Sequence, residues 1–223
     1  MVRIQEAIVK DEVVPVAPVK YDVKSSVILP SQGAISSDIF SEVVEARCSR
    51  RDFLEIQLEE LGPLFYLSSR TKETTTNDYG LVVEKRNSPS CGAMHTVDCI
   101  VSRFSGDGWY VYNARNHSFD LLDVDASIVN QFKLECRKSI ECSDSGYLIW
   151  YVCDLERLSC KYENAEFLAL RESGALAATQ GLIAESYGLG FCILGLMGCQ
   201  EAKAFSNQRN LLGVGVAVIG GIL

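Results

Sequence analysis

The sequence predicts an α+β fold, because helical and strand segments alternate irregularly instead of in repeating strand–helix units. Residues 147–153 (YLIWYVC) form an apolar run of strand length, as expected of a central strand buried on both faces. Residues 164–187 form the longest helical segment, which is rich in alanine and which Gly188 can terminate. Residues 211–223 are a second apolar run, which we expect to be a buried final strand.

The remaining segments are assigned in order along the chain. Residues 1–35 predict an extended N-terminal arm, and residues 36–223 the domain itself. Ser36 or Ser37 can cap a helix over residues 36–47, and Gly62-Pro63 should break or kink a second helix over residues 55–68. The polar residues 71–79 are expected to be a mobile loop. Strands are expected at residues 80–84, 96–101 and 108–112, and a further helix at residues 126–139.

Composition limits the function classes. The chain has 223 residues, 48% of them hydrophobic, so it can bury a sizeable core. Its formal net charge of −8 argues against binding to nucleic acid or to an anionic membrane. The first residues include acids and no long apolar region, so we expect no signal peptide and a cytoplasmic protein. Nine cysteines without a C-x-x-C spacing, and only two histidines, predict reduced thiols and no metal site.

One basic segment, residues 47–51, stands out in this acidic chain. Three arginines (Arg47, Arg50 and Arg51) fall within five residues, together with Ser49, at the end of the helix expected over residues 36–47. Arginine offers planar, bidentate donors that suit phosphate, and a serine hydroxyl adds another donor. The segment therefore indicates a site for one small anionic molecule, although a solvated charged turn explains it equally well.

Two further motifs have both a chemical and an ordinary explanation. Residues 88–95 (SPSCGAMH) include several small residues and lead into a strand. Small side chains would let the backbone approach a flat ligand. The alternatives are an ordinary turn before the strand and a catalytic Cys91–His95 pair. In Lys161-Tyr162, the ammonium can favour the phenolate and assist proton transfer, unless the two are merely surface residues. The glycine-rich residues 188–195 follow a helix, so they do not match a dinucleotide fingerprint, but they can lie along a ligand.

Taken in order, these motifs resemble the nitroreductase family of flavoproteins. Arg47-x-Ser49-x-Arg51-x-Phe53 is similar to that family's R-x-S-x-R-x-F flavin motif. The resemblance is closest to the SagB-type peptide dehydrogenases, which act in microcin B17 and streptolysin S biosynthesis. That branch has counterparts of residues 89–96 (PSCGAMHT), of residues 112–122 with His117, of Lys161-Tyr162, and of residues 172–196. The resemblance covers roughly residues 28–222.

The resemblance implies an FMN-binding α+β sheet flanked by helices, assembled as an intertwined homodimer with its sites at the interface. Arg47 and Ser49 would hold the phosphate, and Arg51 would face the N1/O2 edge of the flavin. Backbone from the other subunit would border the flavin ring, and a late loop would cover its other side. The bordering residues are Pro89, Ser90, Cys91 and Gly92; the covering residues are Ile193, Leu194, Gly195 and Leu196.

The activity that the resemblance implies is oxidation of thiazoline or oxazoline rings in a ribosomal peptide to thiazole or oxazole. Lys161 and Tyr162 would transfer the proton, and molecular oxygen would reoxidise the flavin. A cyclodehydratase partner and a precursor peptide are implied with it. The alternatives are an NAD(P)H-dependent nitro or quinone reductase, a non-catalytic accessory subunit of a peptide-modifying complex, and a hydrolase that uses Cys91.

Overall fold

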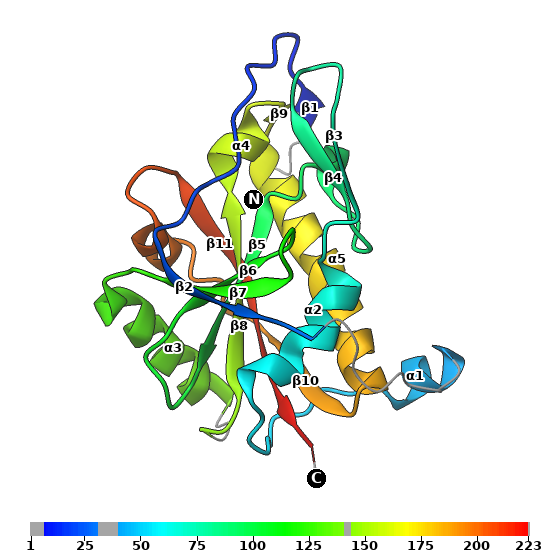
Figure 1. Ribbon diagram of the computed structural model, residues 1–223, viewed down its shortest axis with the longest axis vertical. Helices are drawn as coiled ribbons and strands as arrows, with labels where there is room; N and C mark the ends of the chain where they lie inside the picture. The colour runs from blue at the N-terminus through cyan, green and yellow to red at the C-terminus, as the bar shows by residue number, and fades with distance from the viewer. Residues whose placement is uncertain (1–6, 31–39, 141–143, 223) are drawn as a thin grey trace, which may run out of the picture.

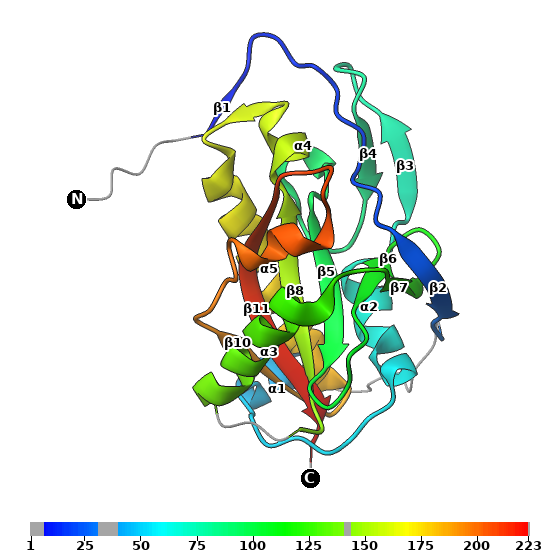
Figure 2. The same cartoon turned by 90° about the vertical axis from the view of Figure 1, so that its left-hand side faces the viewer.

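A seven-stranded sheet with antiparallel neighbours forms the centre of the computed structural model, which describes residues 7–30, 40–140 and 144–222. The strand order is β10-β11-β8-β5-β6-β7-β2. The strands are β2 (Val23–Ile28), β5 (Val97–Arg103), β6 (Tyr110–Asn113), β7 (Ser118–Leu122), β8 (Tyr147–Asp154), β10 (Leu189–Leu194) and β11 (Leu211–Gly221). Figure 2 shows β10 at one edge of this sheet and β2 at the other. The α+β class predicted from the sequence is confirmed.

The two apolar runs form adjacent strands at the centre of the sheet. All eight residues of β8 are buried, and β8 lies between β11 and β5. A strand covered on both faces needs apolar side chains on both, which explains why this run shows no alternation. The register between β8 and β11 shifts between Gly213 and Gly215.

Helices cover both faces of the sheet (Figure 1). One face carries α5 (Ala165–Ser186) and α2 (Gly62–Ser68), and the other carries α3 (Ala126–Ile140) and the short helix η3 (Glu201–Phe205). The long helix α5 ends as predicted, with Gly188 just beyond it at φ +65°. None of the helices in the described part of the chain combines the length and the apolar character that a bilayer crossing demands.

The first predicted helix is described only in part, and the second is divided in two. Helix α1 (Phe40–Ala46) occupies the second half of residues 36–47; the proposed caps Ser36 and Ser37 lie outside the described residues. Within residues 55–68, a 3-10 helix η1 (Leu58–Leu61) is followed by α2, which begins at Gly62 with proline in its first turn. Proline fits the first turn because the backbone N–H that it lacks has no intrahelical partner there.

The prediction of a mobile loop over residues 71–79 was wrong. Strand β3 (Glu73–Thr76) pairs antiparallel with β4 (Val82–Lys85), and the Asn77 side chain accepts hydrogen bonds from the backbone of Tyr79 and Leu81 in the connecting turn. Polarity suggested a loop, but threonine is β-branched and suits a two-stranded hairpin whose outer face meets solvent. All four residues of β3 are exposed.

Residues 7–30 contain no helix, and two short strands among them pair with the rest of the chain. Strand β1 (Ile8–Val9) pairs with the short β9 (Tyr162–Glu163), and β2 pairs with β7 at the edge of the central sheet. The pattern of residues 1–35 did not predict that β2 joins the sheet, because five of its six residues are exposed. The division into an arm (1–35) and a domain (36–223) remains a prediction.

Candidate functional site

The basic segment 47–51 lies alongside the edge strand β10. Ser49 forms a parallel bridge with Phe191, and the Arg50 backbone N–H donates to the Phe191 carbonyl at 3.2 Å. This pairing places the segment next to Ile193, which is two residues further along β10. Segment 47–51 therefore lies beside the strand that carries Ile193 and Leu194 and that continues into Gly195 and Leu196.

Arg50 is held differently from its two neighbours. Its guanidinium makes a bidentate ion pair with Glu185 in the last turn of α5, with 3.0 Å between Nη2 and Oε1. Arg47, Ser49 and Arg51 are exposed, and their side chains have no hydrogen bond or ion pair with other described residues. Two arginines and one hydroxyl thus remain available for an anion, while Arg50 anchors the segment. The family resemblance gave no ligand role to Arg50, but the charge pattern could not show its ion pair, because its partner is 135 residues away.

Phe53, two residues after the segment, packs its side chain against three glycines. A Cβ atom added at Gly146, Gly190 or Gly220 would lie 2.8, 3.1 and 2.6 Å, respectively, from the Phe53 side chain. Real Cβ atoms essentially never come within 3.0 Å of another group, so at least two of these positions must lack a side chain. The glycines of β10 and β11 therefore position Phe53, and with it the arginines that precede it.

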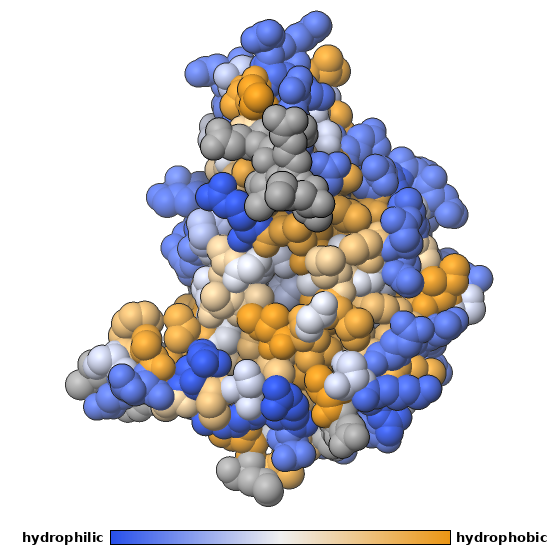
Figure 3. All heavy atoms as spheres, turned by 180° about the vertical axis from the view of Figure 1, so that it is seen from behind, coloured by the Kyte–Doolittle hydropathy of each residue, from blue (hydrophilic) through white to orange (hydrophobic). Residues whose placement is uncertain are grey.

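The edge formed by β10 and the loop after it is apolar and partly exposed. Leu194 is buried, whereas Ile193 is 53% exposed and Met197 40%. Gly195 is exposed and Leu196 half-buried. Seen from the β10 side, apolar residues dominate the centre of the molecule and surround a shallow hollow (Figure 3). This surface can pack against a flat aromatic ligand beside the free arginines.

The small-residue loop 88–95 meets Lys161 and Tyr162 at Gly92. A Cβ atom at Gly92 would lie 2.8 Å from the Tyr162 hydroxyl and 2.9 Å from Lys161 Nζ. Gly92 has φ +61°, a conformation that L residues rarely adopt. The Tyr162 hydroxyl and the Lys161 ammonium therefore both lie next to the backbone of Gly92. Lys161 is mostly buried, with 9% relative exposure, so it is not the surface lysine that the alternative explanation of this pair requires.

The Cys91 nucleophile hypothesis receives no geometric support. The backbone N–H of Cys91 donates to Glu172 at 3.2 Å, and its thiol faces the Leu168 carbonyl, with no hydrogen bond to His95 among the described residues. Burial, with the Glu172 carboxylate next, raises the pKa of the Cys91 thiol. A cysteine nucleophile needs a lowered pKa and a nearby base. Loop 88–95 is instead shaped by Ser90, whose hydroxyl accepts the His95 N–H at 2.7 Å.

Within one chain, the two groups of residues lie apart. Glu185 holds segment 47–51 at one end of α5, whereas Glu172 holds loop 88–95 about four turns earlier. Thirteen helical residues span about 20 Å. A single chain therefore does not gather all the proposed ligand-binding residues around one point, as expected if loop 88–95 comes from a second subunit.

Comparison with solved structures gives this architecture a precedent. A candidate nitroreductase from Ralstonia eutropha JMP134 is similar with a TM-score of 0.64 at 19% identity, covering 95% of this chain and 98% of that one. One from Anabaena variabilis gives a TM-score of 0.63 at 15% identity, with 92% of this chain matched to 40% of that longer chain. The E. coli microcin synthetase McbBCD complex with truncated pro-MccB17 gives 0.58 at 18% identity, covering 86% and 77%.

These likenesses establish a nitroreductase-like fold. No protein-family model and no curated protein matches the sequence. The predicted fold class is thus confirmed, while the dimer that accompanied the prediction remains to be tested.

Proposed function

We propose that this protein is an FMN-dependent oxidoreductase. The observation that carries the proposal is the set of free donors, Arg47, Ser49 and Arg51, beside an apolar sheet edge in a nitroreductase-like fold. Arg47 suits the phosphate, since arginine forms strong, bidentate hydrogen bonds to phosphate, and the Ser49 hydroxyl adds another donor. Arg51 suits the N1/O2 edge of the ring, where negative charge develops in the reduced flavin, and Ile193, Leu194, Gly195 and Leu196 offer apolar contact. When bound, FMN supplies a two-electron acceptor.

The second half of the site is proposed to come from a partner copy of the chain. Pro89, Ser90, Cys91 and Gly92 would then border the ring, bringing Lys161 and Tyr162 with them. The exposed apolar side chains of Ile193 and Met197, on and after β10, support a homodimer, because a second copy of the chain would bury them. Sedimentation at micromolar concentration tests this: a stable, flavin-loaded monomer would contradict it.

The proposed reaction is oxidation of an azoline ring in a ribosomal peptide to the azole. The ring loses an α proton and a β hydride, and the residues placed to take the proton are Lys161 and Tyr162, whose heads converge over Gly92. The microcin synthetase neighbour supports this choice. A cyclodehydratase partner, a precursor peptide, a cytoplasmic location and reoxidation by molecular oxygen belong to the same proposal.

A nicotinamide-dependent reductase is the second candidate. The observation that favours it is the likeness to the NADPH:FMN oxidoreductase of Vibrio harveyi, a structure complexed with NAD+, with a TM-score of 0.53 at 14% identity. Lys161→Ala and Tyr162→Phe separate the two. Both variants should stay yellow but lose azole formation by about 10²–10⁴-fold. Any nicotinamide oxidation should change little, because it needs no proton abstraction from carbon. Wild-type azole formation in both variants would remove the pair from the mechanism.

Cofactor binding is tested first. Purified protein should be yellow or take up added FMN, and Arg47→Ala should leave it largely flavin-free. Arg137→Ala, which removes an arginine from α3 on the other face of the sheet, is the matched control and should retain flavin. A colourless wild-type protein that binds no FMN would refute the proposal and favour a non-catalytic accessory subunit.

A further inference from the structure

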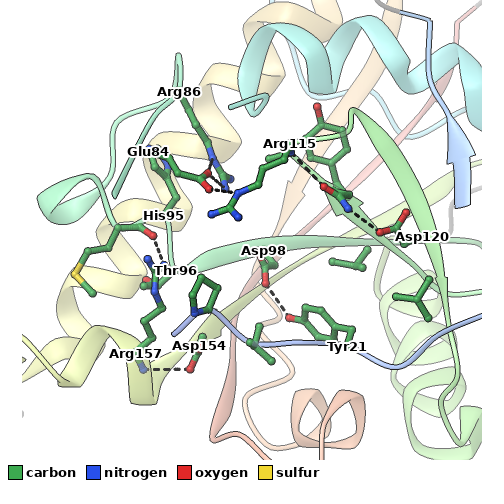
Figure 4. Close-up of a pocket in the computed structure, with 18 residues that line it drawn as sticks. Tyr21, Glu84, Arg86, His95, Thr96, Asp98, Arg115, Asp120, Asp154 and Arg157 are labelled. Atoms are coloured by element: carbon green, nitrogen blue, oxygen red, sulfur yellow. Dashed lines mark hydrogen bonds and ion pairs between the residues drawn. The ribbon is translucent and has the colours of Figure 1, made fainter. Parts of the chain in front are cut away.

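A polar cavity of about 240 Å³ lies behind the loop 88–95, whose Met94 and His95 form part of its lining (Figure 4). Its walls come from β5, β6 and β7, which are on the β2 side of the sheet, and the extended residues Pro18, Val19 and Tyr21 close it. None of the residues proposed to contact FMN or to transfer protons lines it. The cavity therefore has its own set of lining residues, although it adjoins the loop 88–95.

Most charges around the cavity neutralise one another. Glu84 accepts from Arg86 at 2.7 Å and from Arg115 at 2.7 Å. Asp154 accepts from Arg209 at 2.6 Å and from the backbone N–H of Arg157. These carboxylates have partners of opposite charge and need no ligand.

Arg157 is a buried cation without an anionic side-chain partner among the described residues. It is 4% exposed. Its two terminal nitrogens donate to backbone carbonyls of Met94 and Val82, and its Nε–H has no hydrogen-bond partner. Burial lowers the pKa of this guanidinium, although the carboxylates of Asp154, Asp98 and Glu84 act in the opposite direction from beyond ion-pair distance. A buried charge that lacks a counter-charge is costly, so a carboxylate beside Arg157 would be stabilising.

Two carboxylates in the same cavity lack a cationic partner. Asp98 is partly buried and accepts a hydrogen bond from the Tyr21 hydroxyl at 2.9 Å. Asp120 accepts only from the neutral groups of Ser118 and Asn113. No described Lys, Arg or His lies within ion-pair distance of either carboxylate. In Figure 4, Arg157 lies on one side of the cavity and Asp120 on the other, with Asp98 between them.

We infer that this cavity binds a small zwitterion of the class of a free α-amino acid, with its carboxylate toward Arg157 and its ammonium toward Asp98. A simple anion would meet Asp98 and Asp120, and a simple cation would meet Arg157, so either alone leaves an unpaired charge. The volume is smaller than that of typical drug-sized sites, which suits a molecule of a few heavy atoms. Val19, Val23 and Val111 line the cavity as well and favour a small apolar side chain.

Calorimetric titration of the full-length protein with L-valine and two analogues tests the inference. 3-Methylbutanoate is valine without its amino group, and isobutylamine is valine without its carboxylate. L-Valine should bind at least about tenfold more tightly than either analogue, which corresponds to about 1.4 kcal/mol. Equal affinity of valine and 3-methylbutanoate, or no binding of valine at millimolar concentration, would overturn the inference.

Variants separate a ligand-binding role from a structural one. Asp98→Asn should weaken valine binding at least about tenfold and leave 3-methylbutanoate unaffected or tighter, because the repulsion of anions is removed. Arg157→Gln removes two hydrogen bonds to backbone and can unfold the protein, so Asp98→Asn is the deciding variant. Lys138→Ala on α3 is the control and should bind valine normally. Unchanged valine affinity in Asp98→Asn would refute the inference. FMN absorbance, read separately, reports on the proposed function.

Discussion

Gly92→Ala tests whether Lys161 and Tyr162 act from the place that the structure gives them. Alanine at φ +61° costs about 1–2 kcal/mol in the left-handed region. The new methyl group would also meet the Tyr162 hydroxyl at 2.8 Å and Lys161 Nζ at 2.9 Å. Both contacts are with the ends of side chains, which can retreat by roughly 0.5–1 Å to ordinary contact distance. The clash should therefore displace the Lys161 and Tyr162 side chains and add little to the loss of stability caused by the backbone strain.

Gly188→Ala is the matched control. Gly188 has nearly the same backbone conformation, φ +65°, but nothing lies within 4 Å of an added Cβ. Both variants should lose about 1–2 kcal/mol in urea unfolding. The comparison needs equal protein concentration, because dissociation of a dimer makes stability concentration-dependent.

Only Gly92→Ala should slow azole formation. A misplacement of about 1 Å costs on the order of 10²-fold in rate. Flavin absorbance should remain in both variants, because the phosphate contacts lie at the other end of α5. Equal rates in the two alanine variants would refute the reasoning that the pair acts over Gly92.

Three further outcomes follow from the contacts. Glu185→Gln should weaken FMN binding several-fold without abolishing it, because Arg50 keeps a neutral acceptor but loses its ion pair; fluorescence titration with FMN measures this. Gly220→Ala should destabilise the fold by about 1–3 kcal/mol in urea unfolding, because its Cβ would lie 2.6 Å from Phe53; unchanged stability would contradict that packing. Burial alone would raise the pKa of Glu84. The hydrogen bonds and charges of Arg86, Arg115 and Thr71 instead lower this pKa to about 2, below the ordinary 4.5. The stability that this ionised carboxylate contributes should therefore be complete above about pH 4.5 and be lost as the pH falls toward 2. Glu84→Gln should flatten the acid limb of urea unfolding, and an unchanged limb would show that other groups dominate.

The sequence by itself determined the elements whose patterns are local. The apolar run of β8 could only be a strand buried on both faces, and the length and composition of α5 indicated a long helix ended by Gly188. The resemblance of spaced motifs predicted the nitroreductase-like fold, which structural similarity confirms. The strand and the helix are readable because each pattern depends on residues close in the sequence, whereas the resemblance depends on the order and spacing of several motifs.

The tertiary structure alone decided which charged and polar groups are free. The charge pattern does not distinguish Arg50 from Arg47 and Arg51, and only the fold shows that Arg50 is paired with Glu185, 135 residues away. The threonines of β3 looked like a loop until their pairing with β4 was visible. Likewise, no spacing could place Arg157 and Asp98 around one cavity, because they come from different elements. Pairing, burial and counter-charge are properties of contacts between distant segments, and local sequence patterns do not encode them.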